Sequence, residues 1–174
     1  MDKFSWIKDL VSADQQMEDA GIIDLNMGFD PECRLEDATV DFLNDLKLEF
    51  LKVISAFNQL SHSSLGPIRI YGIAKTKADF MLFRNGFKLI VSMRSGGVIT
   101  ISHHAGVTGH APGQMGVTND ASPDILTAQV QAFGQLRWAC NDQPVNLDYL
   151  IRHYVTRFVK SSLESRTAHG TEFP

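Results

Sequence analysis

Residues 67 to 104 follow a two-residue hydrophobic period that two turn signals interrupt. Asn85-Gly86 is the strongest short hairpin signal in the chain, because a two-residue type I′ turn needs positive φ at both central positions. Ser95-Gly96-Gly97 marks a second hairpin. The pattern predicts an antiparallel meander of four strands, over residues 67–74, 80–83, 87–93 and 98–103.

The turn lengths also predict which side chains share a face of this sheet. A two-residue loop at Asn85-Gly86 places Leu82 opposite Leu89, and a three-residue second loop places Met93 opposite Ile99. We expect the three-residue loop, because a two-residue loop would bring polar side chains into the apolar face. The opposite face then mixes apolar and basic groups, namely Met81, Phe83, Lys88, Ile90, Ser92, Arg94, Val98 and Thr100.

Three helices are expected around the meander. From Leu35 to Leu60 apolar residues recur at three- and four-residue steps, and acidic residues crowd the first half, where they suit the helix dipole. Ser122-Pro123 resembles a helix start, which predicts a helix to about Cys140, and Asn146 begins another over 147–163. The sequence therefore predicts a two-layer α+β fold, in which a four-stranded antiparallel meander packs against an N-terminal long helix and two C-terminal helices.

The domain organisation follows from where this periodicity starts and stops. Residues 1–34 contain a short amphipathic segment over 3–12 and an irregular connector. Residues 35–163 form one α+β domain, a size at which folding buries a core without disulfides. Residues 164–174 have no apolar period and are expected to be a disordered tail.

Composition and charge limit the cellular setting and the partners. The chain has 174 residues and a net charge of −4, without an apolar run of the roughly 20 residues that a membrane span needs. A cytoplasmic location is expected, with Cys33 and Cys140 as two reduced thiols. Residues 1–50 contain 13 acidic and four basic residues, whereas residues 67–102 contain six basic residues and one acidic residue. The charges of the acidic and basic segments either neutralise one another or are solvated. The alternative is that the basic segment binds an anionic partner.

A metal site is the first chemical hypothesis. His103, His104 and His110 lie at a strand end and in a Gly-rich loop, and imidazoles beside a carboxylate such as Asp120 or Asp124 suit zinc. Adjacent histidines on a continuing strand would point to opposite faces. The alternative is that these are polar histidines without a ligand.

Other catalytic patterns are missing from the sequence. There is no G-x-x-x-x-G-K-[ST], G-x-G-x-x-G or G-x-S-x-G motif, and Cys33 lies in an acidic segment that disfavours a thiolate. The carboxylates at Asp37, Asp41 and Asp45 are typical of a solvated helix stripe. We therefore expect no enzymatic activity and no cofactor.

The mixed face of the meander carries the preferred functional hypothesis. Its partner-binding residues would be Met81, Phe83, Lys88, Ile90, Arg94 and Val98. An exposed apolar patch usually indicates a protein partner, and a twofold homodimer is the simplest solution. The expected function is a non-catalytic protein-binding module, as an adaptor, regulator or chaperone-like protein, although a helix of the same chain would equally explain the apolar face.

Two alternatives remain open at the sequence level. One is a metal-dependent or small-ligand-binding enzyme that uses the loop of His103, His104 and His110. The other is nucleic-acid binding through the basic sheet face, where Tyr71 and Phe83 could lie beside Lys88 and Arg94. The pI of about 5.8 argues against nucleic acid.

Overall fold

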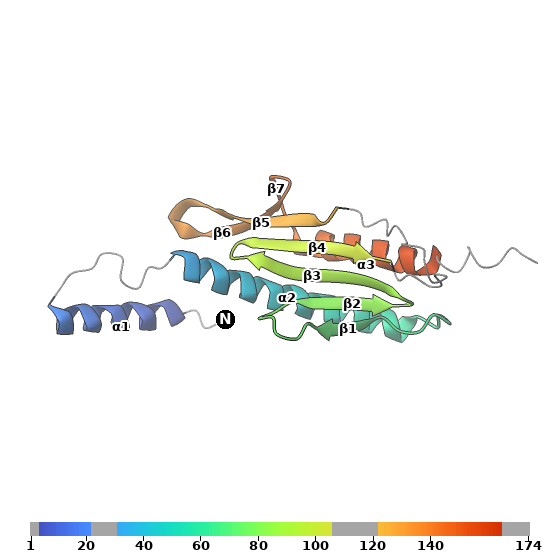
Figure 1. Cartoon of the computed structure of the whole chain (residues 1–174), viewed down its shortest axis with the longest axis horizontal. Helices are drawn as coiled ribbons and strands as arrows, with labels where there is room; N and C mark the ends of the chain where they lie inside the picture. Colours follow the sequence, from blue (N-terminus) through green and yellow to red (C-terminus); the bar gives the residue numbers. More distant parts are fainter. Residues whose placement is uncertain (1–3, 22–30, 106–121, 165–174) are drawn as a thin grey trace, which may run out of the picture.

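The computed structural model describes residues 4–21, 31–105 and 122–164 (Figure 1). In chain order the elements are α1 (Ser5–Ala20), α2 (Pro31–Leu60), β1 (Arg69–Gly72), β2 (Phe80–Arg84), β3 (Phe87–Ser95), β4 (Val98–His104), β5 (Asp124–Val130), the 3-10 helix η1 (Ala132–Gly134), β6 (Leu136–Cys140), β7 (Gln143–Pro144) and α3 (Leu147–Glu164). The strands form one seven-stranded antiparallel sheet in sequence order. The chain therefore has the expected α+β class, built from a longer meander than the sequence predicts.

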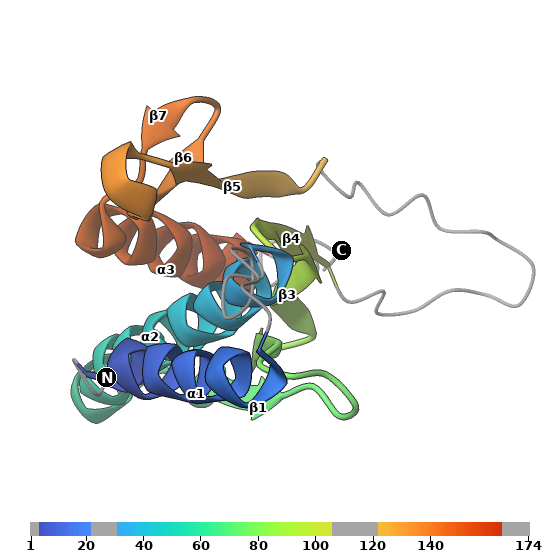
Figure 2. The same ribbon diagram turned by 90° about the vertical axis from the view of Figure 1, so that its left-hand side faces the viewer.

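Helices α2 and α3 cover one face of the sheet. Figure 2 shows both helices on the same side of β3 and β4, while β5, β6 and β7 turn away and pass over α3. The buried side chains of β2–β4 alternate along each strand and meet Leu43, Leu46 and Phe50 of α2 in one core. The face of β1–β4 that points away from α2 and α3 is called the outer face below.

Both hairpins of the central meander have the predicted register. Leu82 lies opposite Leu89, and Met93 lies opposite Ile99. Asn85 and Gly86 have φ values of 49° and 80°, as a type I′ turn requires. The pairing shifts between Met93 and Ser95, which makes a bulge beside the second turn.

The second turn also fixes the sheet to the start of α2. The Thr39 hydroxyl accepts a hydrogen bond from the Gly97 nitrogen at 2.8 Å and donates one to the Leu35 carbonyl at 2.6 Å. Gly97 has φ +78°, and an added Cβ would lie 3.0 Å from a methyl carbon of Leu35. A side chain at this position would therefore be both strained and crowded.

The prediction of four strands and two C-terminal helices is wrong. Residues 123–140 form β5, η1 and β6 instead of a helix, and α3 is the one helix in the described residues after the sheet. Positive φ angles at Phe133, Gly134, Asn141 and Asp142 bend this stretch into two reversals of direction. The reason is that β5 pairs with β4, which satisfies a row of backbone groups that a four-stranded sheet would leave at its edge.

The other predicted helices differ from the observed ones mainly at their ends. The helix expected from Leu35 begins at Pro31, inside the predicted connector, and α1 extends to Ala20. Helix α3 confirms the predicted range almost to the residue. The apolar period of α2 includes Val53 and Leu60, yet these side chains are 40% and 83% exposed. The expected connector at 22–30 and the tail at 165–174 lie outside the described residues.

A buried arginine connects hairpin β2–β3 to the ends of both long helices. Arg84 is 2% exposed, and its Nε donates to the Gly66 carbonyl at 3.1 Å while its Nη1 donates to the Ser162 hydroxyl at 3.4 Å. Its guanidinium carbon lies 5.3 Å from the centre of the Phe57 ring. Burial lowers the pKa of Arg84. Because Phe57 and Ser162 lie in the last turns of α2 and α3, the negative ends of two helix dipoles stabilise this cation.

Candidate functional site

The outer face brings the predicted partner-binding residues together. Cross-strand pairing sets Met81 opposite Ile90 and Phe83 opposite Lys88. The four apolar members, Met81, Phe83, Ile90 and Val98, are half-buried, and Lys88 and Arg94 are exposed. In the described part of the chain α2 and α3 lie on the other side of the sheet, so they do not seal this patch (Figure 2).

Further residues extend this patch beyond the prediction. Tyr71 pairs with Met81 and Ile125 pairs with Thr100, and these two apolar side chains are 40% and 41% exposed. Arg69 lies opposite Phe83 and adds another exposed cation. Alternation along β1–β4 puts no Asp or Glu at an outward position. The outer face therefore combines an apolar patch with polar side chains such as Ser92 and Thr100, and it has no acidic residue within β1–β4.

The histidines of the zinc hypothesis do not converge. Alternation along β4 turns His103 toward α3, where its ring centre lies 5.9 Å from that of Tyr154, while His104 points outward and its Nε2 lies 3.0 Å from the Ser102 hydroxyl. His110 lies outside the described residues. In those residues no group of three or more His, Cys, Asp or Glu side chains could hold a metal ion. A site that includes His110 stays a prediction.

A polar cluster that the sequence did not reveal lies between α3 and the inner face of the sheet. The Tyr154 hydroxyl on α3 donates a hydrogen bond of 2.7 Å to Asp124 Oδ2 at the start of β5. The rings of His153 and Tyr154 meet edge to face, with their centres 5.1 Å apart. The Nε2 of His103 is buried and has no hydrogen-bond partner. Such an orphaned polar atom marks a place where a ligand or water would complete the hydrogen bonding.

Burial controls the protonation of this cluster. It lowers the pKa of His103, an effect to which the charge of Arg157 adds. It raises the pKa of Tyr154, with the hydrogen bond to Asp124 acting in the same direction, and it raises the pKa of the Cys140 thiol. The imidazole, the phenol and the thiol are therefore neutral near pH 7. They can exchange hydrogen bonds with a ligand, but the thiol is not activated as a nucleophile.

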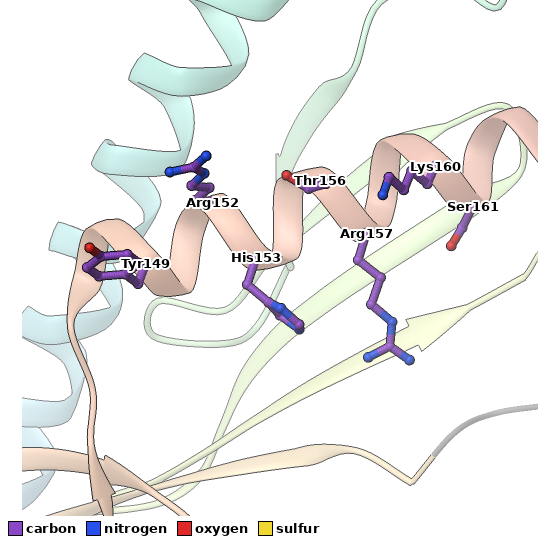
Figure 3. Close-up of a pocket in the computed structure, with 7 residues that line it drawn as sticks. All are labelled: Tyr149, Arg152, His153, Thr156, Arg157, Lys160 and Ser161. Carbon is purple, nitrogen blue, oxygen red and sulfur yellow. The ribbon is translucent and has the colours of Figure 1, made fainter.

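Two adjoining clefts lie along α3. The larger, of about 590 Å³, is lined by Tyr149, Arg152, His153, Thr156, Arg157, Lys160 and Ser161 (Figure 3). The smaller, of about 320 Å³, lies between α3 and β5–β6 and is lined by Asp124, Leu126, Cys140, Val145, Asn146, Tyr149, Leu150, His153 and Tyr154. Tyr149 and His153 line both clefts, so the two are neighbours along α3. The first is called the cationic groove and the second the apolar cleft.

The sequence contains one signal for the strands that flank the apolar cleft. The Asn141-Asp142 pair that follows Cys140 is typical of a two-residue hairpin turn. Interpreting 123–140 as two strands would have placed Asp124 and Cys140 at the sheet. The approach of Tyr154 to Asp124 depends on how the sheet curves, which periodicity does not predict.

Comparison of the chain with protein-family models, with curated proteins and with solved structures found no match. None of the helices in the described part of the chain is long and apolar enough to cross a membrane. Any functional assignment must therefore come from the surfaces of the fold.

Proposed function

We propose that the chain is a non-catalytic protein-binding module that associates through the outer face. The supporting observation is a half-exposed apolar patch, centred on Met81, Phe83 and Ile90, on the side of the sheet that α2 and α3 leave open. A contiguous apolar surface of this kind is stabilised when a partner removes it from water. An adaptor, regulator or chaperone-like role fits such a surface.

A second copy of the chain is the partner that we propose for this face. A twofold axis through the patch would pair the apolar centre of one copy with that of the other, which makes the contact closed and self-complementary. Lys88 of β3 and Arg69 of β1 lie beside Phe83 on the neighbouring strands, so each copy would bring these cations to the contact. A homodimer would cover the apolar centre with one closed contact.

Salt dependence separates self-association from binding to an acidic partner. In a homodimer both copies bring cations to the contact, so a rise in salt screens repulsion and strengthens association. With an acidic partner the same rise in salt screens attraction and weakens association. The direction of the salt effect therefore identifies the occupant of the face.

Sedimentation equilibrium of the full chain tests the proposal. We expect a dimer for the wild type at micromolar concentration and a monomer for Ile90→Asp, which buries an unpaired carboxylate at the contact. Phe83→Asp should also give a monomer, because it removes an aromatic ring from the apolar contact and leaves a carboxylate that pairs with Arg69 or Lys88 of its own chain. Far-ultraviolet circular dichroism should show the same helix content in all three proteins. Leu48→Asp is the matched control, since Leu48 is 55% exposed on α2, in the other layer of the fold.

Three results would contradict parts of this proposal. A wild type that stays monomeric up to about 0.1 mM would overturn self-association. A dimer that Leu48→Asp disrupts and Phe83→Asp preserves would move the contact to α2. A dimer that dissociates as salt rises would contradict the charge argument.

The proposed setting is the cytoplasm. Cys140 is a free cysteine in the described residues, and its raised pKa keeps the thiol protonated. Free thiols persist in reducing compartments. If the chain is recovered in the same cell fraction as a cytoplasmic marker, this location is supported. If it is recovered with periplasmic or secreted proteins, the location is wrong.

A further inference from the structure

The exposed side of α3 concentrates positive charge in a chain that is acidic as a whole. Arg152, Arg157 and Lys160 are exposed and line the cationic groove together with the exposed His153. Figure 3 shows His153 and Arg157 extending from the same side of α3. Among the described residues none of the three Arg and Lys side chains pairs with a carboxylate. Their charge is available to an anion.

Hydroxyl groups complete the donor set of the groove. Tyr149, Thr156 and Ser161 line it beside the cations, and no carboxylate is among its lining residues. Guanidinium, ammonium and hydroxyl donors are the groups that bind phosphate in proteins. The lining therefore suits an anionic group such as a phosphate, which can accept hydrogen bonds from several of these donors along α3.

The apolar cleft extends this groove toward the sheet. Leu126, Val145 and Leu150 provide an apolar wall, and the rings of Tyr149 and Tyr154 provide aromatic surface. Asp124 is the single carboxylate of this cleft, and its Oδ2 already accepts the Tyr154 hydrogen bond. A carboxylate has further lone pairs, which can accept an N–H group from a ligand.

We propose that the groove and the cleft together form one binding site for a nucleotide-like small molecule, with phosphates on Arg157 and Lys160 and a flat nitrogen-bearing ring in the apolar cleft. The proposal rests on the proximity of the two clefts, which share Tyr149 and His153 as lining residues. Their volumes lie in the range of about 300–1,000 Å³ that small-molecule sites occupy. The buried, unpartnered Nε2 of His103 is a further polar group in the same region.

The site is separate from the surface proposed for protein binding. It lies on α3 and the β5–β6 hairpin, whereas the protein-binding patch lies on the outer face of β1–β4. Each proposal can therefore fail without the other. A nucleotide bound here would be a ligand of the module, and the proposal does not include its hydrolysis.

Isothermal titration calorimetry of the full-length protein tests the two halves of the site with three probes. ADP should fill both halves, inorganic pyrophosphate only the cationic groove, and adenosine only the apolar cleft. We expect ADP to bind at least about tenfold more tightly than either fragment, because it joins the two sets of contacts in one molecule.

A charge-matched pair of double variants separates the site from general electrostatics. Arg157→Gln/Lys160→Gln removes two cations from the groove and should weaken ADP and pyrophosphate binding at least about tenfold. Lys75→Gln/Arg137→Gln removes two exposed cations that line neither cleft, and it should change ADP binding less than about twofold. Circular dichroism checks that both proteins are folded.

The outcomes decide the proposal. No ADP binding at millimolar concentration would overturn it, as would an equal loss of affinity in the two double variants, which would indicate a general charge effect. Equal affinities for ADP and pyrophosphate would show that the apolar cleft is not used, and the nucleotide-like class would then be wrong. Tighter binding of ADP, lost only in Arg157→Gln/Lys160→Gln, would support the whole site.

Discussion

Truncation of Arg84 should destabilise the chain by about 3 kcal/mol. Arg84→Ala removes two hydrogen bonds from a charged donor, of which the one to Gly66 is well formed and the one to Ser162 is long. We assign them about 1.5 and about 1 kcal/mol, and the contact with Phe57 about 0.5 kcal/mol. Burial of the aliphatic stem adds about 2 kcal/mol. Against this stands the cost of burying the cation, about 2 kcal/mol in this site near two helix C-termini.

A methionine at the same position separates these contributions. Arg84→Met keeps an apolar stem of similar length and carries no charge to desolvate, but it leaves the Gly66 carbonyl without its donor. We expect a loss of about 1 kcal/mol, which is the cost of that unpaired carbonyl. The expected order of stability is therefore wild type, then Arg84→Met, then Arg84→Ala.

Urea unfolding and thermal unfolding, both followed by circular dichroism, measure this order of stability. For a chain of this length, about 3 kcal/mol corresponds to a fall in melting temperature of roughly 6–12 °C. Arg137→Ala, at an exposed arginine of β6, is the control and should stay within about 0.5 kcal/mol of the wild type. The reasoning fails if Arg84→Ala lies within about 1 kcal/mol of the wild type, or if Arg84→Met is the less stable of the two.

Three further changes test other parts of the fold. Burial lowers the pKa of His103, so the stability that this neutral side chain contributes is complete above the unfolded pKa of about 6.5 and is lost as the pH falls toward the folded pKa. The urea midpoints at pH 7.5 and pH 5.5 should therefore differ less in His103→Leu than in the wild type. An equal difference in the two proteins would contradict this. Gly97→Ala should lower stability by about 2 kcal/mol, because the position combines φ +78° with contact to Leu35; a melting temperature equal to that of the wild type would show that the turn relaxes freely. Phe133→Asn should raise stability by about 0.5 kcal/mol, since Phe133 has φ +61° and a fully exposed ring, and calorimetry that shows a loss would reveal a contact for this ring.

The parts of the fold that could be predicted are those that short-range chemistry determines. Asn85-Gly86 supplies the two positive φ angles of its turn, and the turn length then sets Leu82 against Leu89 without information from elsewhere. Helix α3 follows equally from a local apolar period and from Asn146, whose Oδ1 accepts the Tyr149 amide at 3.3 Å. The outward residues of the β2–β3 hairpin can therefore be derived from the sequence alone.

The second half of the sheet could not be derived in this way. Leu126, Val130 and Leu136 have spacings that fit one face of a helix as well as alternate positions of two strands. Pairing of β5 with the free edge of β4 decides between these possibilities, and that pairing joins residues about 25 positions apart, such as Thr100 and Ile125. The apolar cleft could not be predicted for the same reason, because it exists only where β5–β6 passes over α3.

The arrangement in layers also explains the charge asymmetry of the sequence. An ion pair joins the acidic helix to the basic segment, between Lys77 and Glu36 at 2.6 Å. Lys88 lies opposite Phe83 on the outer face, with the sheet between it and the carboxylates of α2. The cations of the outer face and of α3 lie on opposite sides of the fold, so the proposed homodimer contact and the proposed nucleotide site do not overlap.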